Sequence, residues 1–271
     1  MINDILGWLT DPANGDDILK RLLEHLQYVF LATLVAAAVA IPAGLWVGHT
    51  GRGKFAVVNI SGFARAIPTL GLLFFIVLWL GPSLNGDLAF LLPSLVVLVV
   101  LAIPPILAGT YAGIDEVDPA ARDAARGMGM RGWQVLFRVE VPCALPLIFS
   151  GLRSALLQVV ATATIAATVG LGGLGRFLID GLAVRDYPQM ASGAVLVAAL
   201  ALFIDLVVAV VQRLTVSRGV TGRFRTRRGR AAAGGTHETR PTPSSTTSST
   251  TSSTTSSTTS TSTTTTVGPV S

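Results

Sequence analysis

Residues 88–110 read LAFLLPSLVVLVVLAIPPILAGT, and this stretch contains no charged residue. About 20 consecutive apolar residues in a helix are enough to cross the hydrocarbon core of a bilayer. The stretch is therefore expected to be a membrane-spanning helix, with Pro104 and Pro105 near its end.

The composition of the whole chain indicates a membrane protein. Of the 271 residues, 51% are hydrophobic and 13% are charged, whereas a soluble domain carries about 25% charged residues. The formal net charge is +5, but much of the excess lies in an Arg-rich stretch, 218–230, directly after the last apolar run. This position is typical of the cytoplasmic flank of a membrane helix rather than of a nucleic-acid-binding face. The single cysteine, Cys143, excludes an internal disulfide and a cysteine-based metal site.

Further long apolar runs predict an all-α fold, a polytopic membrane bundle of five core transmembrane helices within residues 26–215. The spans are expected at 26–48, 56–80, 88–110, 142–168 and 190–212. The second span is expected to break at Arg65-Ala66-Ile67-Pro68-Thr69. Before the first span, the N-terminal segment 1–25 is expected to be irregular over 1–13 and to form a short amphipathic helix over 16–24.

The basic residues predict which connections are cytoplasmic. They follow the first, third and fifth spans, at Arg52 and Lys54, at Arg122, Arg126, Arg131 and Arg138, and in the final Arg cluster. Because positive residues favour the cytoplasmic side, the N-terminus and the acidic turn 81–87 are expected outside and the C-terminus inside. The remainder, 216–271, begins basic and becomes almost pure Ser/Thr from Thr236 to Thr266, which predicts a disordered cytoplasmic tail.

The cytoplasmic segment 118–138 has the most informative pattern. Asp118 and Pro119 are typical of a helix start, because Asp caps free N–H groups and Pro lacks one. Gly127 and Gly129 are expected to end this helix.

The same segment offers a small, flat helical face formed by Ala120, Ala121, Ala124 and Ala125. Such a face fits close docking onto another protein, and a solvated loop helix with ordinary alanines is the alternative. A second short helix is expected over 132–138, and Pro142 is expected to end the segment where the next span begins.

This region resembles a signature of ABC importer permeases, which has the form E-A-A-x3-G-x9-I-x-L-P. The chain has Asp123-Ala124-Ala125, Gly129 and Val139-Glu140-Val141-Pro142 at matching spacing, with Asp for Glu and Val for Ile and Leu. Over about residues 20–215 the chain resembles the branch that transports glycine betaine, choline, carnitine and proline betaine. The matching stretches are Arg65 to Leu70, Gly151-Leu152-Arg153, Thr162-Ala163-Thr164 and Gly170 to Gly175.

The resemblance implies a permease of the type I importer kind in a bacterial cell membrane. It implies that 118–138 is a coupling segment for an ATPase subunit, with contacts from Asp123, Ala124, Ala125, Gly129, Val139, Val141 and Pro142. The expected partners are a second permease copy, identical or a close paralogue, two ABC ATPase subunits, an extracytoplasmic binding protein and membrane lipid. The ATPase subunit would use ATP and Mg²⁺, and no catalytic residue, metal or cofactor is expected in this chain.

Two other functions stay open at this point. One is an ABC permease for another small solute, such as methionine or an alkyl sulfonate. The other is a secondary transporter that needs no ATPase, although such carriers typically show inverted repeats and more spans. The stretch Gly48 to Phe55 nearly matches a phosphate-binding loop, but it lacks the Ser or Thr that should ligate Mg²⁺ and it follows a membrane helix. A basic turn is therefore expected there.

Residues within the spans suggest a translocation path or gate. The candidates are Pro68, Thr69, Thr162, Thr164, Gly172 and Gly173. Threonines in membrane helices often bond only their own backbone, which is the alternative interpretation. The run 170–175 is either a flexible outside turn or a place of close backbone approach at a gate or dimer interface. Arg65 is expected to extend to the cytoplasmic surface, and an interior ion pair with Asp205 is the alternative.

Overall fold

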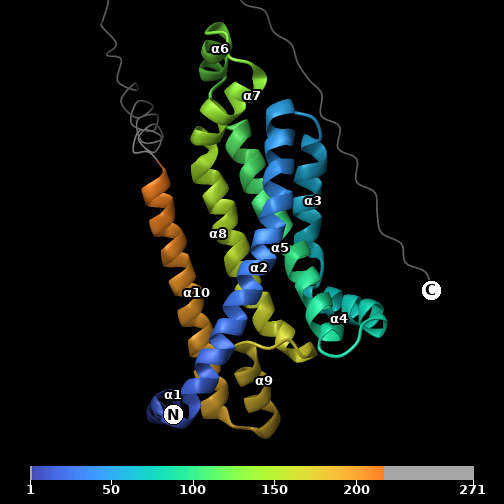
Figure 1. Ribbon diagram of the computed structural model, residues 1–271, viewed down its shortest axis with the longest axis vertical. Coiled ribbons are helices and arrows are strands. Elements are labelled where there is room, and N and C mark those ends of the chain that lie inside the picture. The colour runs from blue at the N-terminus through green and yellow to red at the C-terminus, as the bar shows by residue number, and fades with distance from the viewer. Residues whose placement is uncertain (1, 217–271) are drawn as a thin grey trace, which may run out of the picture. The chain divides into compact units, whose positions relative to one another are not determined.

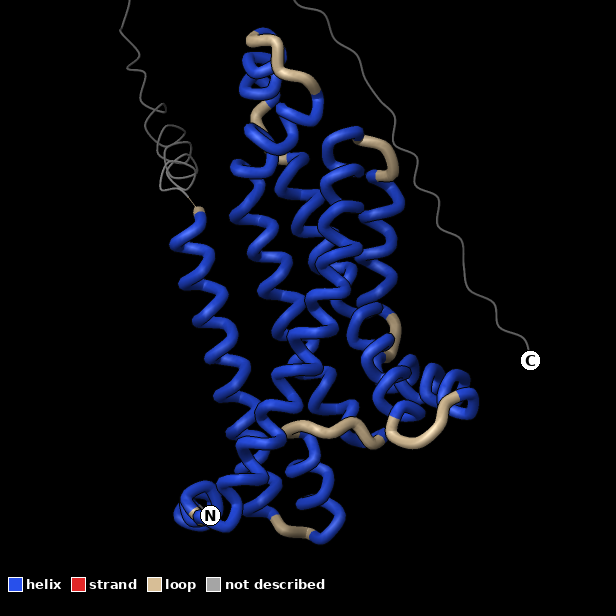
Figure 2. The backbone as a smooth tube through the Cα atoms, in the orientation of Figure 1, coloured by secondary structure: helices blue, strands red, loops and turns tan. Residues whose placement is uncertain are grey.

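A computed structural model describes residues 2–216, and every regular element in this range is a helix (Figures 1 and 2). The side chains of residues 2, 60, 61 and 63–65 are outside the description, and so is the predicted tail from 217 onward. The predicted all-α class is confirmed. The elements are α1 (Ile2–Thr10), α2 (Pro12–Thr50), α3 (Lys54–Ala66), α4 (Thr69–Leu80), η1 (Gly81–Ser83), α5 (Leu88–Asp115), α6 (Pro119–Gly127), α7 (Gly132–Val135), η2 (Leu136–Glu140), α8 (Val141–Ala166), η3 (Ala167–Val169), α9 (Gly175–Val184) and α10 (Tyr187–Thr215).

Four helical segments of the described chain are long and apolar enough to cross a membrane. They are α2, α5, the continuous segment Gly132–Val169 and α10. Each contains one of the predicted spans, because a long apolar run without charges is stable in lipid only as a helix whose backbone groups are paired internally.

The remaining predicted span, 56–80, is divided between α3 and α4 at the expected break. Ile67 has an extended backbone, with φ −73° and ψ 124°, because the ring of the following Pro68 hinders the helical conformation. The apolar helix Thr69–Ser83 is shorter than the four long segments, and it turns away from the direction of α3 (Figure 1).

The prediction that residues 1–13 are irregular is wrong, because α1 occupies most of this range. Its formation depends on tertiary packing: Trp8 lies edge-to-face on Phe177, with ring centroids 5.1 Å apart. Asp11 then caps α2 by accepting a backbone hydrogen bond at 2.9 Å. The amphipathic stretch 16–24 is therefore the first part of α2 rather than a separate helix.

Pro142 does not end the cytoplasmic segment, contrary to the prediction. One continuous helical segment runs from Gly132 to Val169 and includes α7, the π-helical turn η2 and α8. In η2 the Val141 N–H bonds to the carbonyl of Leu136, five residues back. A π turn directly before the proline re-pairs the backbone where the missing N–H would otherwise interrupt the helix.

Close packing of α2, α5 and α8 forms the centre of the bundle. A Cβ built on Gly109 of α5 would lie 2.7 Å from the Gly151 Cα of α8. Between α2 and α5, a Cβ on Gly44 would lie 2.7 Å from the Thr110 Cβ. Helices in lipid gain little from burying apolar surface, so close approach through small residues supplies much of their packing.

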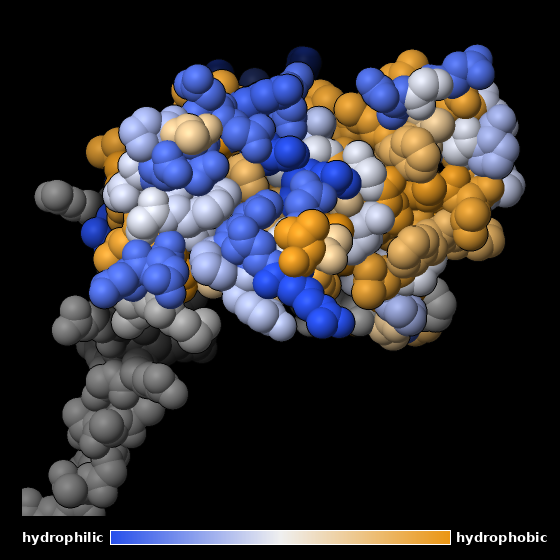
Figure 3. Space-filling model, turned by 90° about the horizontal axis from the view of Figure 1, so that it is seen from below, coloured by the Kyte–Doolittle hydropathy of each residue, from blue (hydrophilic) through white to orange (hydrophobic). Residues whose placement is uncertain are grey.

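Several connections lie at the two ends of the described bundle, whereas those on either side of α4 lie between them (Figure 1). The elements α6 and α7 and the turn between α2 and α3 share one end, and α1 and α9 lie at the other. The connections that are rich in basic residues before residue 217 are therefore together, as charge predicts. Figure 3 views the end at α1 and α9, where hydrophilic residues cover much of the surface. Apolar residues gather on the side of α4, whose Phe75, Leu78 and Trp79 are exposed.

Candidate functional site

The predicted helix of the 118–138 segment is α6, which stands at the end of the bundle (Figure 1). The Asp118 carboxylate accepts a hydrogen bond from the Ala120 N–H at 2.9 Å, and Pro119 follows at the first helical position. This is the cap that the sequence predicts. The start of α6 is therefore determined by residues that are adjacent in the chain.

The alanine face of α6 is divided between the surface and the interior. Ala120 and Ala124 are exposed, whereas Ala125 is only 2% exposed and Ala121 is partly buried. Residues four apart share one side of a helix, so these two pairs lie on adjacent sides rather than on one presented face. Among the expected coupling residues, Asp123 and Ala124 lie on the exposed side, and Ala125 packs α6 against its own chain.

Gly129 lies in the reversal between α6 and α7. Its φ is +83°, a region that residues with a Cβ rarely adopt. A Cβ at this position would meet nothing within 4 Å. The backbone conformation, rather than lack of space within the chain, therefore requires the glycine.

The second half of the signature lies on the helix that returns into the bundle. Val139 belongs to η2, and Val141 and Pro142 begin α8. Both valines are partly buried, and Val141 packs against a small apolar cluster, whereas Pro142 is exposed. The cluster consists of Ile114, Leu136, Ala144 and Ile148. The signature therefore covers two elements, an exposed helix and the connection that attaches it to a span.

Glu140 is the centre of an ionic cluster that the sequence did not reveal. Its side chain is 1% exposed, and Oε2 lies 2.7 Å from Nδ1 of His49 in the last turn of α2. Oε1 lies 3.1 Å from Nε of Arg122 on α6, within ion-pair range but without hydrogen-bond alignment. Arg122 Nη2 also donates to the carbonyl of Ile114 near the end of α5. The only sequence signal was an acidic residue between two valines, at the unspecified position of the signature.

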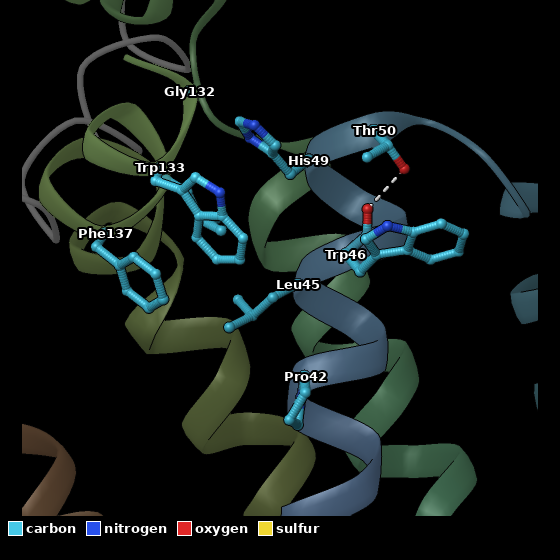
Figure 4. A pocket seen from close by; sticks show the side chains of 9 residues that line it. Pro42, Leu45, Trp46, His49, Thr50, Gly132, Trp133 and Phe137 are labelled. Atoms are coloured by element: carbon cyan, nitrogen blue, oxygen red, sulfur yellow. Dashed lines mark hydrogen bonds between the residues drawn. The ribbon is translucent and has the colours of Figure 1, made fainter. Parts of the chain in front are cut away.

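An apolar cavity of about 530 Å³ lies beside this cluster, between the end of α2 and α7 (Figure 4). Figure 4 shows Trp133 and Phe137 on one wall and Leu45 and Pro42 on the other, with His49 above them. The Trp133 and Phe137 rings stack with centroids 5.8 Å apart. At this level α2 and the α7–η2 helix are therefore separated by a hollow.

The candidate path residues in the helices have local hydrogen bonds. The hydroxyls of Thr162 and Thr164 donate to the carbonyls four residues earlier, at 2.8 and 2.9 Å. This agrees with the alternative that such threonines bond their own backbone. Pro68 is exposed and Thr69 is partly buried at the break between α3 and α4. Their role in a translocation path stays a prediction.

The glycine-rich run 170–175 packs closely against α2. The Gly173 N–H donates to Glu24 Oε2 at 3.1 Å, and the Gly173 φ is +83°. A Cβ on Gly172 would lie 2.6 Å from the same Oε2, and a Cβ on Gly173 would lie 3.0 Å from His25 Nδ1. Within this chain the run therefore approaches α2 at Gly172 and Gly173 and the backbone of α8 at Gly175, and a role at a gate or dimer interface stays a prediction.

Asp205 on α10 pairs with Arg153 on α8, and the side chain of Arg65, the partner that the sequence suggested, lies outside the described ones. The contact is bidentate: Nε of Arg153 bonds to Oδ1, and Nη2 bonds to Oδ2 at 2.5 Å. Paired charges of this kind are the usual arrangement within membrane spans. Across residues 2–216, no group of three His, Cys, Asp or Glu side chains is arranged to hold a metal ion.

The chain is similar to known membrane transport components over most of its length. The family described as "Binding-protein-dependent transport system inner membrane component" matches residues 40–218. The chain is 32% identical over 221 residues to the glycine betaine/carnitine/choline transport system permease protein OpuCB of Bacillus subtilis (strain 168). The aligned region covers 82% of this chain and 98% of that protein. The chain is 30% identical over 220 residues to the osmoprotectant import permease protein OsmW of Salmonella typhimurium, covering 80% and 99%.

Solved structures show the same fold. The chain is similar to a chain of the MetNI methionine ABC transporter in inward-facing conformations, with a TM-score of 0.66 and 21% identity, covering 77% of this chain and all of that chain. A chain of an amino acid ABC transporter with histidines gives a TM-score of 0.55 at 20% identity, covering 73% and 91%. At these identities the likeness concerns the fold alone, and it confirms the predicted fold class.

Proposed function

The chain belongs to the inner-membrane components of binding-protein-dependent transport systems, and we propose that it is the permease of an importer for quaternary-amine compatible solutes such as glycine betaine or choline. The observation that carries the choice of solute is the near-complete coverage of the relatives named for these compounds and for osmoprotectants, 98% of one and 99% of the other. The likeness to a methionine transporter at 21% identity concerns the fold, so it does not favour methionine.

In this proposal α6 is the element that binds a separate ATPase subunit. Its support is a capped helix at one end of the bundle, with the small side chain of Ala124 and the carboxylate of Asp123 exposed. Small side chains let a helix dock closely in a groove of a partner. ATP and Mg²⁺ are then used by the ATPase, and this chain supplies the contact and no catalytic residue.

The end that carries α6 is proposed to be cytoplasmic. Arg52, Lys54 and the arginines of the 118–138 segment lie at this end, and basic residues favour the cytoplasmic side. The N-terminus then lies outside, and the chain after α10 continues on the cytoplasmic side. The assembled unit would contain two permeases, two ATPases and one binding protein outside the cell.

Alternating access requires that motion of α6 changes the spans. The segment Gly132–Val169 has 38 residues in one continuous helix, which is about 57 Å at 1.5 Å per residue. A displacement of α6 by the ATPase would therefore be transmitted to a single helix that extends through the bundle. The solute must bind the outward and inward states with different affinities, since equal affinities would shift nothing.

Transport in proteoliposomes tests this proposal. The permease is reconstituted with the ATPase and the binding protein of the same organism, and ATP-dependent uptake of labelled choline, glycine betaine and methionine is measured. We expect uptake of a quaternary amine but not of methionine, and no uptake without the ATPase. Uptake that proceeds at the full rate without ATPase or ATP would refute the importer assignment, and uptake of methionine alone would refute the solute class.

A pair of matched variants tests the coupling role within the same assay. Gly129→Val and Gly86→Val place the same side chain on glycines with positive φ, +83° and +62°, where a Cβ would meet nothing within 4 Å. The backbone strain is therefore similar, but Gly86 lies in the turn before α5, away from α6. We expect only Gly129→Val to abolish ATPase assembly or ATP-driven uptake while membrane insertion persists. Full transport by Gly129→Val would contradict the coupling role.

A further inference from the structure

The ionic cluster of Glu140, His49 and Arg122 lies where α6 joins the spans. We propose that Glu140 is a positioning residue that makes α6 and the end of α2 move as one body when the partner displaces α6. This inference rests on the proposed function, because it assumes that an ATPase pulls on α6.

Burial of the Glu140 carboxylate makes the link stiff. Its two oxygens face different elements, with Oε2 toward His49 of α2 at 2.7 Å and Oε1 toward Arg122 of α6 at 3.1 Å. A carboxylate that is 1% exposed loses its hydration and must keep its charged and hydrogen-bonding partners. Moving α6 away from α2 would separate Glu140 from Arg122 or from His49 and leave a buried carboxylate with one of its two partners, which favours keeping the three side chains together.

Arg122 extends the link to α5. Its guanidinium donates to the carbonyl of Ile114, in the last turn of that helix. Carbonyls at a helix C-terminus lack intrahelical partners, and a cation there is favoured by the helix dipole. The ends of α2 and α5 are thus both attached to α6 through Arg122 and Glu140.

Apolar packing replaces this link only in part on the side of α2 that faces α7, because Leu45 is the α2 residue that packs against the cluster containing Leu136. The cavity of about 530 Å³ lies there, with Leu45 on one wall and Trp133 on the other. His49, at the edge of the cavity, reaches Glu140 from α2 (Figure 4). At the level of the cavity, the contact between His49 and Glu140 is therefore a direct polar connection between the end of α2 and η2.

A second ion pair at the same end provides the control. Lys54 of α3 and Asp115 of α5 lie 3.1 Å apart, but their side chains are 58% and 48% exposed. Exposed pairs contribute little because water screens both charges. Asp115→Asn is therefore the matched control for Glu140→Gln. Both variants replace a carboxylate by a neutral amide, but Asp115→Asn removes an exposed ion pair rather than a buried one.

The test compares the number of ATP molecules hydrolysed per solute moved by the reconstituted transporter. For Glu140→Gln we expect this ratio to rise severalfold, because displacement of α6 is then transmitted less completely to the spans. The ATPase should still co-purify with the variant, because the exposed face of α6 is unchanged. For Asp115→Asn the ratio should stay at the wild-type value.

Variants of His49 keep the test decisive if Glu140→Gln fails to assemble. His49 is partly exposed, so His49→Ala should fold and should also raise the ratio. His49→Gln restores a donor toward Glu140 and should return the ratio toward wild type. Because both residues act through one link, the double variant should be no worse than Glu140→Gln alone. A wild-type ratio for His49→Ala in an assembled transporter would overturn the proposal, whatever Glu140→Gln does.

A wrong solute assignment can be distinguished from a wrong assignment of the link between α6 and α2. If the wild-type transporter moves no quaternary amine, the solute assignment is wrong, and the link is then read from amide hydrogen exchange in the purified permease. Exchange in α6 should be faster in His49→Ala than in wild type and unchanged in Asp115→Asn. Equal exchange in all three proteins would refute the link itself.

Discussion

The contact between α5 and α8 predicts the effect of one added methyl group. Gly151 lies where α8 crosses α5, and the change Gly151→Ala adds a Cβ at this crossing. That Cβ would lie 2.7 Å from the carbonyl oxygen of Pro105 and 3.1 Å from the Cα of Gly109. Both atoms belong to the backbone of α5, so neither can rotate away.

The size of the effect follows from these distances. Ordinary contact begins near 3.4 Å, so the helices must separate locally by about 0.7 Å (3.4 − 2.7). Overpacking of this kind costs about 1–3 kcal/mol. Replacing glycine by alanine inside a helix itself contributes about 1 kcal/mol in the stabilising direction. We therefore expect a net loss of up to about 2 kcal/mol in the free energy of unfolding, which is about 1–3 kcal/mol relative to a glycine-to-alanine change that meets no contact.

Unfolding of the purified permease by increasing SDS, followed by loss of helicity, measures this difference. The matched control is Gly62→Ala on α3, where a Cβ would meet nothing within 4 Å. It should be neutral or stabilising by up to about 1 kcal/mol. Gly109→Ala should resemble Gly151→Ala, and the double variant should lose less than the sum, because one separation of the helices relieves both clashes.

The reasoning fails if Gly151→Ala is as stable as Gly62→Ala. That result would mean that α5 and α8 do not approach as closely as the two glycines require. Strictly additive losses in the double variant would show that the two substitutions act at independent places.

Three further changes have defined outcomes. Gly173→Ala should lower the free energy of unfolding by about 1–3 kcal/mol in the same titration, because its φ is +83°; unchanged stability would argue against this loop conformation. Asp118→Ala should remove the cap of α6 and speed amide exchange in its first turn about fivefold, whereas Asp118→Asn should retain most of the protection; equal exchange in both would contradict the cap. Arg153→Met should reduce the amount of folded permease in membranes because Asp205 loses its partner, and adding Asp205→Leu should recover much of it; no recovery would mean that Arg153 acts otherwise.

Much of the fold could be predicted because its signals are local. A long run without charges needs only its own backbone to form a span, as in residues 88–110. The break at Ile67–Pro68 and the cap by Asp118 each depend on residues that are neighbours in the chain. The basic residues after the first and third spans likewise predicted that these two connections share an end of the bundle.

Predictions that depended on packing were less accurate. Residues 1–13 have a weak local signal, and α1 forms where Trp8 can pack on Phe177, far along the chain. Pro142 was expected to end a segment, but the π turn before it accommodates the missing N–H within a continuous helix. The burial of Ala125 depends on how α6 is rotated against its own chain, which the signature does not specify.

By itself, the sequence determined that this protein is a helical membrane permease, where most of its spans lie and where the capped helix of segment 118–138 begins. Only the tertiary structure decided the partners of the charges: Asp205 pairs with Arg153, and Glu140 pairs with His49 and Arg122. The physical reason is that a buried charge needs whichever opposite charge is close in space. That proximity is determined by the rotation and depth of helices whose contacts, such as the one at Gly151, involve backbone atoms that no sequence pattern displays.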